Sequence, residues 1–272
     1  MLVPGSCSTG AAWRPMIANW NGEMRCVTTS LLGYGGTTER RTARDTFIAH
    51  EAEVLESVIR RTGGSVHLVG HSFGGLVALA VALRNQVDLA SLIVIEAPAV
   101  GVLRDNGELR HYHHFRDMTD AYFAAFNDGD LEAIATMIDF YGGAGTFASF
   151  PPPVRAYAVE TTPVNILDWA SAYGFSPPGA SLAAMEIPAL VLCGGASHPA
   201  VRRANELLSQ FMRSAALVTV EGASHFMIAT HATQISRLIA EHVNQAEIAK
   251  AGGETFASEG EPQAQFVSEK AA

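Results

Sequence analysis

The run Gly70-His71-Ser72-Phe73-Gly74 can supply a nucleophile, because it holds a serine between glycines directly after an apolar stretch. That stretch, 66–69, predicts a buried strand, and the apolar range 75–83 predicts a buried helix. A sharp strand-to-helix turn leaves no room for bulky neighbours, so it would present the Ser72 hydroxyl at the carboxyl edge of a sheet. The backbone N–H of Phe73 would lie at the helix start, where it could stabilise an oxyanion.

A histidine far downstream can supply the matching base. It lies in Glu221-Gly222-Ala223-Ser224-His225-Phe226, just after a predicted strand over 216–220. A serine hydroxyl is a weak nucleophile until a neighbouring base removes its proton. Ser72 together with a suitable downstream histidine therefore predicts nucleophilic catalysis at a carbonyl group.

The elements that must position these residues alternate along the chain. Strands are predicted over 24–29, 66–69, 92–95, 189–193 and 216–220, with helical patterns between them. The last helix places Ile235, Leu238, Ile239 and His242 on one face. Continuous apolar strands alternating with helices are typical of a parallel sheet that is covered on both faces. We therefore predict an α/β fold with a mostly parallel, doubly wound sheet.

The range 100–186 interrupts this alternation. Helical patterns over 118–127 and 131–141 are separated by glycine and proline clusters, and aromatic residues are frequent. We interpret this range as a helical lid, or cap, inserted into a core formed by 1–99 and 187–245. Most of its aromatic side chains would form the core of the lid, and a minority would face a pocket. The range 246–272 lacks periodicity and predicts a flexible C-terminal tail.

Composition limits the class of protein. The 272 residues suffice for one large α/β domain with an insertion, or at most two domains. Hydrophobic residues make up 48% and charged residues 17%, which excludes global disorder. The net charge of −9 argues against nucleic-acid and anionic-membrane surfaces. No apolar run reaches the roughly 18 residues of a membrane span, and no signal peptide is visible, so a cytoplasmic location is expected. Cys7, Cys26 and Cys193 are scattered and are expected to be reduced.

Taken together, the pattern resembles the α/β-hydrolase fold from residue 1 to about 245. The resemblance rests on Gly70-His71-Ser72-Phe73-Gly74-Gly75, Val3-Pro4-Gly5-Ser6, Leu32-Gly33-Tyr34-Gly35 and the segment around His225. It implies that Ser72 is the nucleophile and His225 the general base. It also implies that the backbone N–H groups of Phe73 and Ser6 form the oxyanion hole, and that neither a metal nor an organic cofactor is required.

Two departures from the family pattern matter. Members usually carry two strands before the oxyanion-hole loop, whereas Met1-Leu2-Val3 begins almost at that loop. The sheet is therefore expected to lack its first strands, unless the natural start lies upstream. The second departure is that the usual acid position, after the strand 189–193, reads Gly194-Gly195-Ala196-Ser197 and holds no carboxylate.

Glu96 is the preferred triad acid, because it ends the strand 92–95 at the same sheet edge as Ser72. A base histidine needs a carboxylate on its other ring nitrogen to fix its tautomer. Some α/β-hydrolases carry their acid at this point, including haloalkane dehalogenases and the zearalenone-type lactonases, which share the order Ser, Glu, His. Asp168, Asp117, Asp120 and a bare Ser–His dyad remain alternatives.

Other polar residues have plainer interpretations. Ser197 and His198 occupy the vacant acid loop and are expected at the surface, although support of His225 is an alternative. His71 is expected to pack and to form hydrogen bonds. The run His111-Tyr112-His113-His114 lacks acidic ligands at metal-binding spacing, so no metal site is predicted.

The sequence thus predicts a serine hydrolase that cleaves an ester or a lactone through an acyl-enzyme. The aromatic, lightly charged lid predicts an apolar substrate of moderate size, bound by Cys7, Tyr122, Phe126, Trp169 and Phe226. Hydrolysis of a C–C bond or a thioester, or a non-catalytic ligand receptor of the same fold, are the alternatives. A serine in the turn argues against haloalkane dehalogenases and epoxide hydrolases, which need a carboxylate there. The oligomeric state stays open, and a homodimer paired through the lid is one option.

Overall fold

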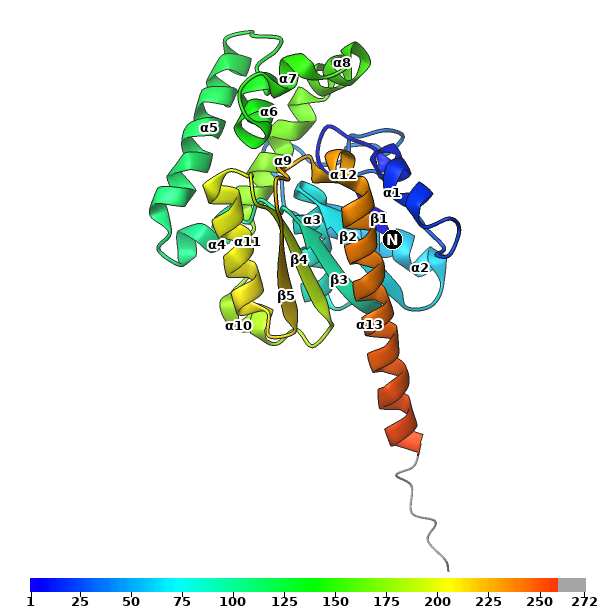
Figure 1. The fold of residues 1–272 in the computed structure, drawn as a ribbon. Coiled ribbons are helices and arrows are strands. Elements are labelled where there is room, and N and C mark those ends of the chain that lie inside the picture. Colours follow the sequence, from blue (N-terminus) through cyan, green and yellow to red (C-terminus); the bar gives the residue numbers. More distant parts are fainter. Residues whose placement is uncertain (259–272) are drawn as a thin grey trace, which may run out of the picture.

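A computed structural model describes residues 1–258 of the chain. These residues form a five-stranded sheet in the order β1-β2-β3-β4-β5, and every neighbouring pair of strands is parallel (Figure 1). The strands are β1 (Leu2–Val3), β2 (Val66–His71), β3 (Leu89–Ile95), β4 (Ala189–Gly194) and β5 (Ala215–Val220). The predicted α/β class with a parallel sheet is confirmed.

Strands β1 to β4 are largely buried on both faces, which explains why they read as continuous apolar runs, whereas the edge strand β5 is partly exposed. Side chains alternate along a strand, so Leu92 and Val94 of β3 join one core, and Ile93 and Ile95 join the other. The first core holds side chains of α2 (Ala49–Thr62), α3 (Phe73–Arg84) and α11 (Pro199–Phe211). The second holds side chains of η1 (Gly10–Trp13), α1 (Arg14–Asn19), α12 (Met227–Thr230) and α13 (Ala232–Ser258).

Between β3 and β4 the chain forms a series of helices, which we call the helical insertion. It consists of α4 (Val100–Asp105), α5 (Leu109–Asn127), α6 (Ile134–Gly142), α7 (Thr146–Ser149), α8 (Pro152–Glu160), α9 (Thr162–Gly174) and α10 (Gly179–Ala183). Helices α5 to α8 stand beyond the end of the sheet from which α3 begins (Figure 1). Gly143, at φ 94°, ends α6, and Pro151 precedes α8, so these glycine and proline clusters mark helix boundaries.

Two segments differ from the sequence-based expectation. The predicted strand over 24–29 forms only an isolated bridge between Thr28 and Leu2, because β1 is two residues long and offers few ladder bonds. The helix α13 continues to Ser258, beyond the boundary at 245. There, Ala246 is buried and Glu247 Oε1 lies 3.0 Å from His67 Nε2, which are tertiary contacts that periodicity does not reveal. The remaining part of the predicted tail, 259–272, lies outside the described residues.

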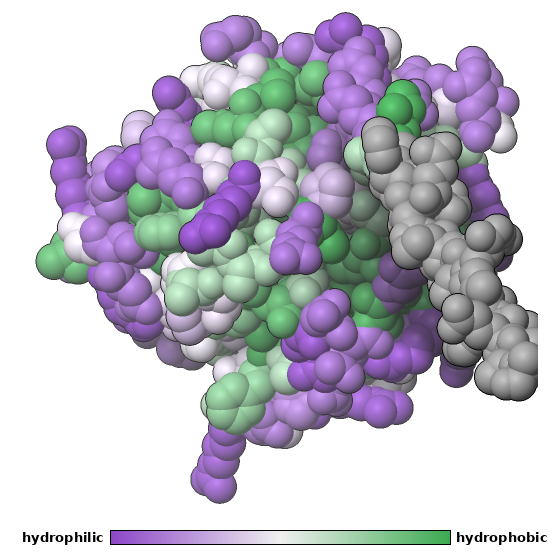
Figure 2. Space-filling model, turned by 90° about the horizontal axis from the view of Figure 1, so that it is seen from below, coloured by the Kyte–Doolittle hydropathy of each residue, from purple (hydrophilic) through white to green (hydrophobic). Residues whose placement is uncertain are grey.

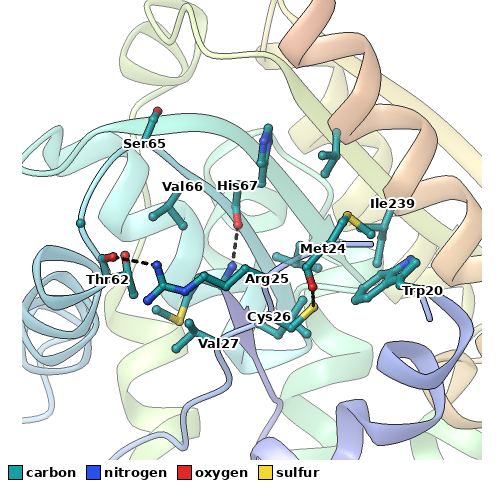
Figure 3. A pocket seen from close by; sticks show the side chains of 15 residues that line it. Trp20, Met24, Arg25, Cys26, Val27, Thr62, Ser65, Val66, His67 and Ile239 are labelled. Carbon is teal, nitrogen blue, oxygen red and sulfur yellow. Dashed lines mark hydrogen bonds between the residues drawn. The ribbon is translucent and has the colours of Figure 1, made fainter. Parts of the chain in front are cut away.

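A cavity of about 320 Å³ lies at the β1 edge of the sheet (Figure 3). Its walls include Trp20, Met24 and Ile239, and the amine of Met1 at its border donates to the His67 carbonyl over 2.9 Å. Burial lowers the pKa of this amine to about 6. Ser72 does not line this cavity.

Viewed from below, the molecule shows apolar side chains in the middle of the face and polar ones around them (Figure 2). Within 1–258, every helix is too short or too polar to cross a bilayer.

Candidate functional site

The register of β2 and β3 brings Ser72 and Glu96 together. His71 pairs with Ile95, so the residue that follows each strand lies at the same edge of the sheet. The Ser72 N–H donates to the Ile95 carbonyl over 2.8 Å. Ser72 has φ 53° and Glu96 has φ 54°, a left-handed conformation that costs energy for residues with a side chain. Two adjacent strained residues at a sheet edge are typical of a functional site.

The glycines around Ser72 allow backbones to approach closely. A Cβ on Gly70 would overlap the carbonyl of Gly74, and a Cβ on Gly74 would overlap the carbonyl of Pro4. A Cβ on Gly5 would lie 2.8 Å from the Cβ of Ser72. The start of α3 is therefore pressed between β2 and the loop after β1, which lies directly beside the serine.

A continuous line of polar contacts joins Ser72 to Glu96. Ser72 Oγ lies 2.9 Å from His225 Nε2, and His225 Nδ1 lies 3.3 Å from Glu96 Oε2. Both His225 and Glu96 are buried. Burial tends to raise the pKa of Glu96, but hydrogen bonds from His225 and from the Gly194 N–H hold that pKa below its ordinary value. The carboxylate therefore stays ionised beside the imidazole.

The loop after β4 supports this carboxylate, contrary to expectation. Ser197, expected at the surface, is buried and donates to Glu96 Oε2 over 2.9 Å. The Gly194 N–H donates to Glu96 Oε1 over 2.7 Å. The reason is topological. Strand β4 lies next to β3, so the loop after β4 lies beside Glu96, the residue that follows β3. His198 instead caps α11, where its Nδ1 accepts from the Ala200 N–H over 3.2 Å.

Aromatic and polar contacts fix the ring and the backbone of His225. The ring of Tyr141, on α6, stacks on it at a centroid distance of 3.8 Å and an angle of 24°. Phe226 contacts it edge-on at 5.5 Å. His71 Nε2 lies 2.8 Å from the His225 carbonyl, and burial together with the nearby His225 lowers the pKa of His71 to about 3. His71 is therefore neutral and donates to this carbonyl. Tyr141 is one of the many aromatic residues of the range 100–186, and nothing in the sequence marks it as the ring that stacks on His225.

Two backbone N–H groups are available beside Ser72. Within residues 1–258, the Ser6 N–H has no hydrogen-bond partner. Phe73 begins α3, and N–H groups in the first turn of a helix have no partner within that helix. These are the two donors that the sequence predicted for an oxyanion.

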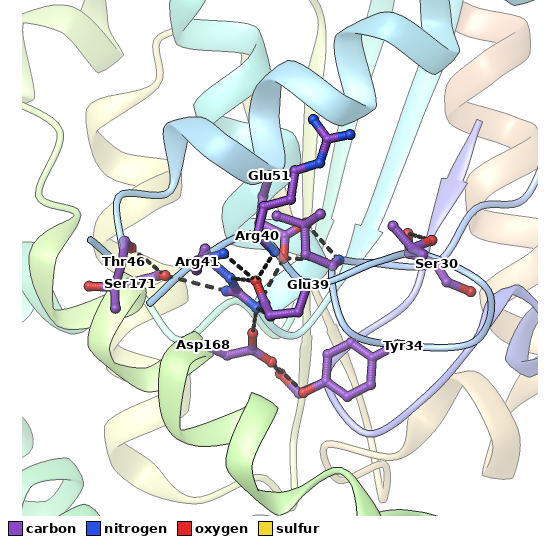
Figure 4. A network of polar contacts seen from close by, with 12 residues as sticks. Ser30, Tyr34, Glu39, Arg40, Arg41, Thr46, Glu51, Asp168 and Ser171 are labelled. Carbon is purple, nitrogen blue, oxygen red and sulfur yellow. Dashed lines mark hydrogen bonds and ion pairs between the residues drawn. The ribbon is translucent and has the colours of Figure 1, made fainter. Parts of the chain in front are cut away.

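Asp168 and Tyr34 belong to a buried charge network (Figure 4), and this network also holds the Ser6 side chain. Asp168, on α9, accepts from Ser6 Oγ over 2.5 Å and from Tyr34 Oη over 2.6 Å. Its other oxygen lies 2.8 Å from Arg41 Nη2. Burial raises the pKa of Asp168 to about 6 in spite of Arg41. Asp168, an alternative triad acid in the sequence, therefore faces the loop after β1, and it is Glu96 that contacts His225.

Arg41 is the centre of this network, and its side chain is completely buried. It also contacts Glu39 at 2.7 Å and Glu51 at 3.4 Å (Figure 4). Burial raises the pKa of Glu51 to about 8, although Arg41 opposes this. Tyr34 belongs to a segment that the sequence singled out. Neither Arg41 nor Glu51 carries a sequence signal, since only the fold shows that they are buried.

A cavity of about 760 Å³ lies above Ser72 and His225, against the helical insertion. Of the residues expected to bind substrate, Cys7, Trp169 and Phe226 border this cavity. Tyr122 and Phe126 do not line the cavity, because the side of α5 that carries them packs into the hydrophobic core. Tyr122, for example, is fully buried, with its hydroxyl 3.5 Å from the Thr162 carbonyl. Apolar wall residues that the sequence did not identify are Met137, Ile138, Phe150, Val154, Ala172 and Ile228.

Other candidate chemistry finds no geometric support. Among residues 1–258, no three His, Cys, Asp or Glu side chains are grouped in a way that would hold a metal ion. His111 Nδ1 instead lies 3.1 Å from Glu108 Oε2. Cys7, Cys26 and Cys193 are free thiols, and burial raises the pKa of Cys7 to about 12, so it is not a thiolate at neutral pH.

Known proteins share this fold. A putative carbamate hydrolase RutD from Caulobacter vibrioides is 30% identical over 134 residues, which cover 49% of this chain and 46% of that protein. Epoxide hydrolase 3 from Xenopus tropicalis is 29% identical over 106 residues, or 39% of this chain and 29% of that protein. The matches thus span less than half the length of these curated relatives. The structure of olei00960, a hydrolase from Oleispira antarctica, has a TM-score of 0.71 at 16% identity, with 89% of each chain covered, and shows the shared fold.

A family profile gives the broadest match. Residues 1–238 match that of the Alpha/beta hydrolase family, well over half of the chain. The protein belongs to the alpha/beta hydrolase family.

Proposed function

We propose that this protein is a serine hydrolase that cleaves a carboxylic ester or lactone of an apolar, medium-sized substrate. The observation that carries the proposal is the line from Ser72 Oγ through His225 to the buried Glu96, at the floor of a 760 Å³ cavity. In such an arrangement the carboxylate orients the imidazole and stabilises its charged form, and the imidazole removes the proton of the serine hydroxyl, which becomes the nucleophile.

In the proposed first step, Ser72 Oγ attacks the carbonyl carbon while His225 Nε2 accepts the hydroxyl proton. Glu96 holds the proton on Nδ1 and stabilises the imidazolium that forms. The imidazolium then protonates the leaving alcohol, and an acyl-enzyme remains on Ser72. His225 next takes a proton from water, which attacks the acyl carbon, and the imidazolium returns this proton to Ser72 Oγ as the acyl–oxygen bond breaks and the acid leaves.

The N–H groups of Ser6 and Phe73 would bind the oxyanion in both steps. Each donor of this kind lowers the barrier by about 3 kcal/mol. Two contacts hold the loop that carries Ser6, namely the Ser6 hydroxyl on Asp168 and the close approach of Gly5 to Ser72. We infer that the buried network around Arg41 keeps this donor in place.

The cavity wall supports an apolar substrate. Its members include Trp169, Phe226, Ile138 and Met137, and such walls gain free energy when apolar surface leaves water. Ester chemistry is favoured over epoxide opening, because the residue in the tight turn is Ser72 and not a carboxylate.

The test is hydrolysis of p-nitrophenyl butyrate by the purified protein and by Ser72→Ala. We expect steady turnover by the wild type and a loss of at least about a thousandfold in the variant. The surface variant Ser57→Ala serves as the control and should match the wild type. Equal rates for the wild type and Ser72→Ala would refute the assignment of the nucleophile. Labelling without turnover would favour a ligand receptor.

A further inference from the structure

We propose that Asn165 forms a hydrogen-bonding subsite in the cavity above Ser72, and that it selects substrates with a hydroxyl group on an otherwise apolar skeleton. The inference rests on the proposed hydrolase function and adds a substrate class to it. It starts from one polar side chain on the cavity wall whose hydrogen bonding is incomplete.

Asn165 lies on α9 and borders the cavity together with Asp168, Trp169 and Ala172. These residues follow it at i+3, i+4 and i+7, so all four share one face of the helix. The residue is only 2% exposed, and its Oδ1 atom has no hydrogen-bond partner among the described residues. A buried amide oxygen without a partner carries an uncompensated desolvation cost. A ligand group in the cavity that bonds to the Asn165 amide would offset part of that cost.

Other unpartnered polar atoms do not share this position. Trp13 Nε1, Ser65 Oγ and His242 Nε2 are also buried without a partner, but none of these residues lines the cavity. Asp168 Oδ1 does belong to a residue of the wall, but it lies 2.8 Å from Arg41. Within 1–258, Asn165 is therefore the one residue of the cavity wall with a buried polar atom that has neither a hydrogen-bond partner nor an ionic partner.

A second buried asparagine shows what a structural role looks like in this fold. Asn205, on α11, accepts from the Ala97 N–H over 3.0 Å and donates to the Ala97 carbonyl over 3.0 Å and to the Val201 carbonyl over 2.8 Å. Its amide is thus fully used in joining α11 to the segment after β3. Asn165 joins nothing through its Oδ1, which separates it from this structural pattern.

The surroundings narrow the chemistry of the ligand group. A carboxylate would be repelled by Asp168, one turn along the same helix face. An ammonium would need a free carboxylate, but Asp168 is already bonded to Ser6, Tyr34 and Arg41. A hydroxyl is neutral, and it can donate to the amide oxygen or accept from the amide nitrogen. Trp169 and Ala172 on the same face require the rest of the ligand to be apolar.

The test compares matched pairs of p-nitrophenyl 3-arylpropanoates that differ by one hydroxyl at successive ring positions. For at least one position, the wild type should hydrolyse the hydroxylated ester with a kcat/KM at least tenfold higher than that of its partner. Asn165→Leu, of similar volume, should abolish this preference. Met137→Leu, on the same wall, is the control and should keep the preference. A wild type without any such preference, or a preference that survives Asn165→Leu, would overturn the proposal.

Two further measurements separate this proposal from the hydrolase function. Calorimetry on Ser72→Ala with hydroxylated and plain aryl ketones needs no turnover, and it should show tighter binding of the hydroxylated ligand that Asn165→Leu removes. If that preference appears while no ester is hydrolysed, the hydrolase function fails and the subsite stands. The Tm of Asn165→Leu should equal or exceed that of the wild type, since a pure scaffold residue would lower it.

Discussion

Replacing Glu96 by Gln changes one atom of the side chain and tests how the site holds its base. In the folded protein, Glu96 Oε1 accepts from the Gly194 N–H, and Oε2 faces both Ser197 Oγ and His225 Nδ1. The amide oxygen of the variant must stay on Gly194, because that group only donates. The amide NH₂ then points at His225 Nδ1.

The consequence for the rate follows from this geometry. An NH₂ group opposite Nδ1 favours the tautomer with its proton on Nε2, which then cannot accept the proton of Ser72 Oγ 2.9 Å away. The negative charge that would stabilise the imidazolium is also lost. A base in the wrong tautomer costs about four orders of magnitude in kcat, which corresponds to about 5 kcal/mol of barrier. We expect a change of that size in kcat and little change in KM.

The assay is the kcat for p-nitrophenyl butyrate, with Glu206→Gln on the surface of α11 as the control for removing a glutamate charge. The kcat of Ser197→Ala should lie between those of Glu96→Gln and Glu206→Gln, about tenfold below the wild type, because the variant lacks the hydrogen bond from Ser197 Oγ to the carboxylate. A kcat of Glu96→Gln within threefold of the wild-type value would refute the reasoning and would favour a Ser–His dyad without a catalytic acid.

Three more outcomes follow from the contacts. Asp168→Asn removes the charge that holds the Ser6 hydroxyl, so kcat should fall about tenfold to a hundredfold with KM nearly constant, and an unchanged kcat would contradict a positioning role. Gly74→Ala should lower the free energy of unfolding in urea by several kcal/mol, because its Cβ would overlap the Pro4 carbonyl, whereas Gly36→Ala, with open space around it, should stay within about 0.5 kcal/mol. The pKa of Glu51 is raised to about 8, so this group contributes stability at low pH that is lost as the pH rises. The wild type should thus lose up to about 1.4 kcal/mol of unfolding free energy per pH unit between about pH 5 and about pH 8, and Glu51→Gln should show a flatter dependence; equal slopes would argue against a buried, proton-binding Glu51.

Local patterns in the sequence predict those parts of the site that lie at the ends of neighbouring strands. Ser72 and Glu96 each follow an apolar strand, and parallel strands end at the same sheet edge, so their proximity could be predicted once the strands were identified. Ser197 could not be placed in this way. Its bond to Glu96 depends on β4 lying next to β3, and strand adjacency is a property of the whole fold.

Long-range burial explains the remaining differences. Arg41 and Glu51 look like ordinary surface charges in the sequence, and only the fold shows that they are buried, Arg41 against Asp168 of α9 and Glu51 against Arg41. Tyr122 and Phe126 were predicted at the pocket because they are aromatic, but composition does not say which face of α5 meets a cavity. Asn165 has no motif at all, and an unpartnered amide can be recognised only in three dimensions.

The central claim is that Ser72 Oγ carries the acyl group during turnover. The most direct measurement is mass spectrometry of the protein quenched in acid while it hydrolyses p-nitrophenyl butyrate, with the modified peptide sequenced. The account predicts one added butyryl group, located on Ser72 and absent from Ser72→Ala. A butyryl group on another residue, or steady turnover with unmodified protein and undiminished rates in Ser72→Ala, would contradict it.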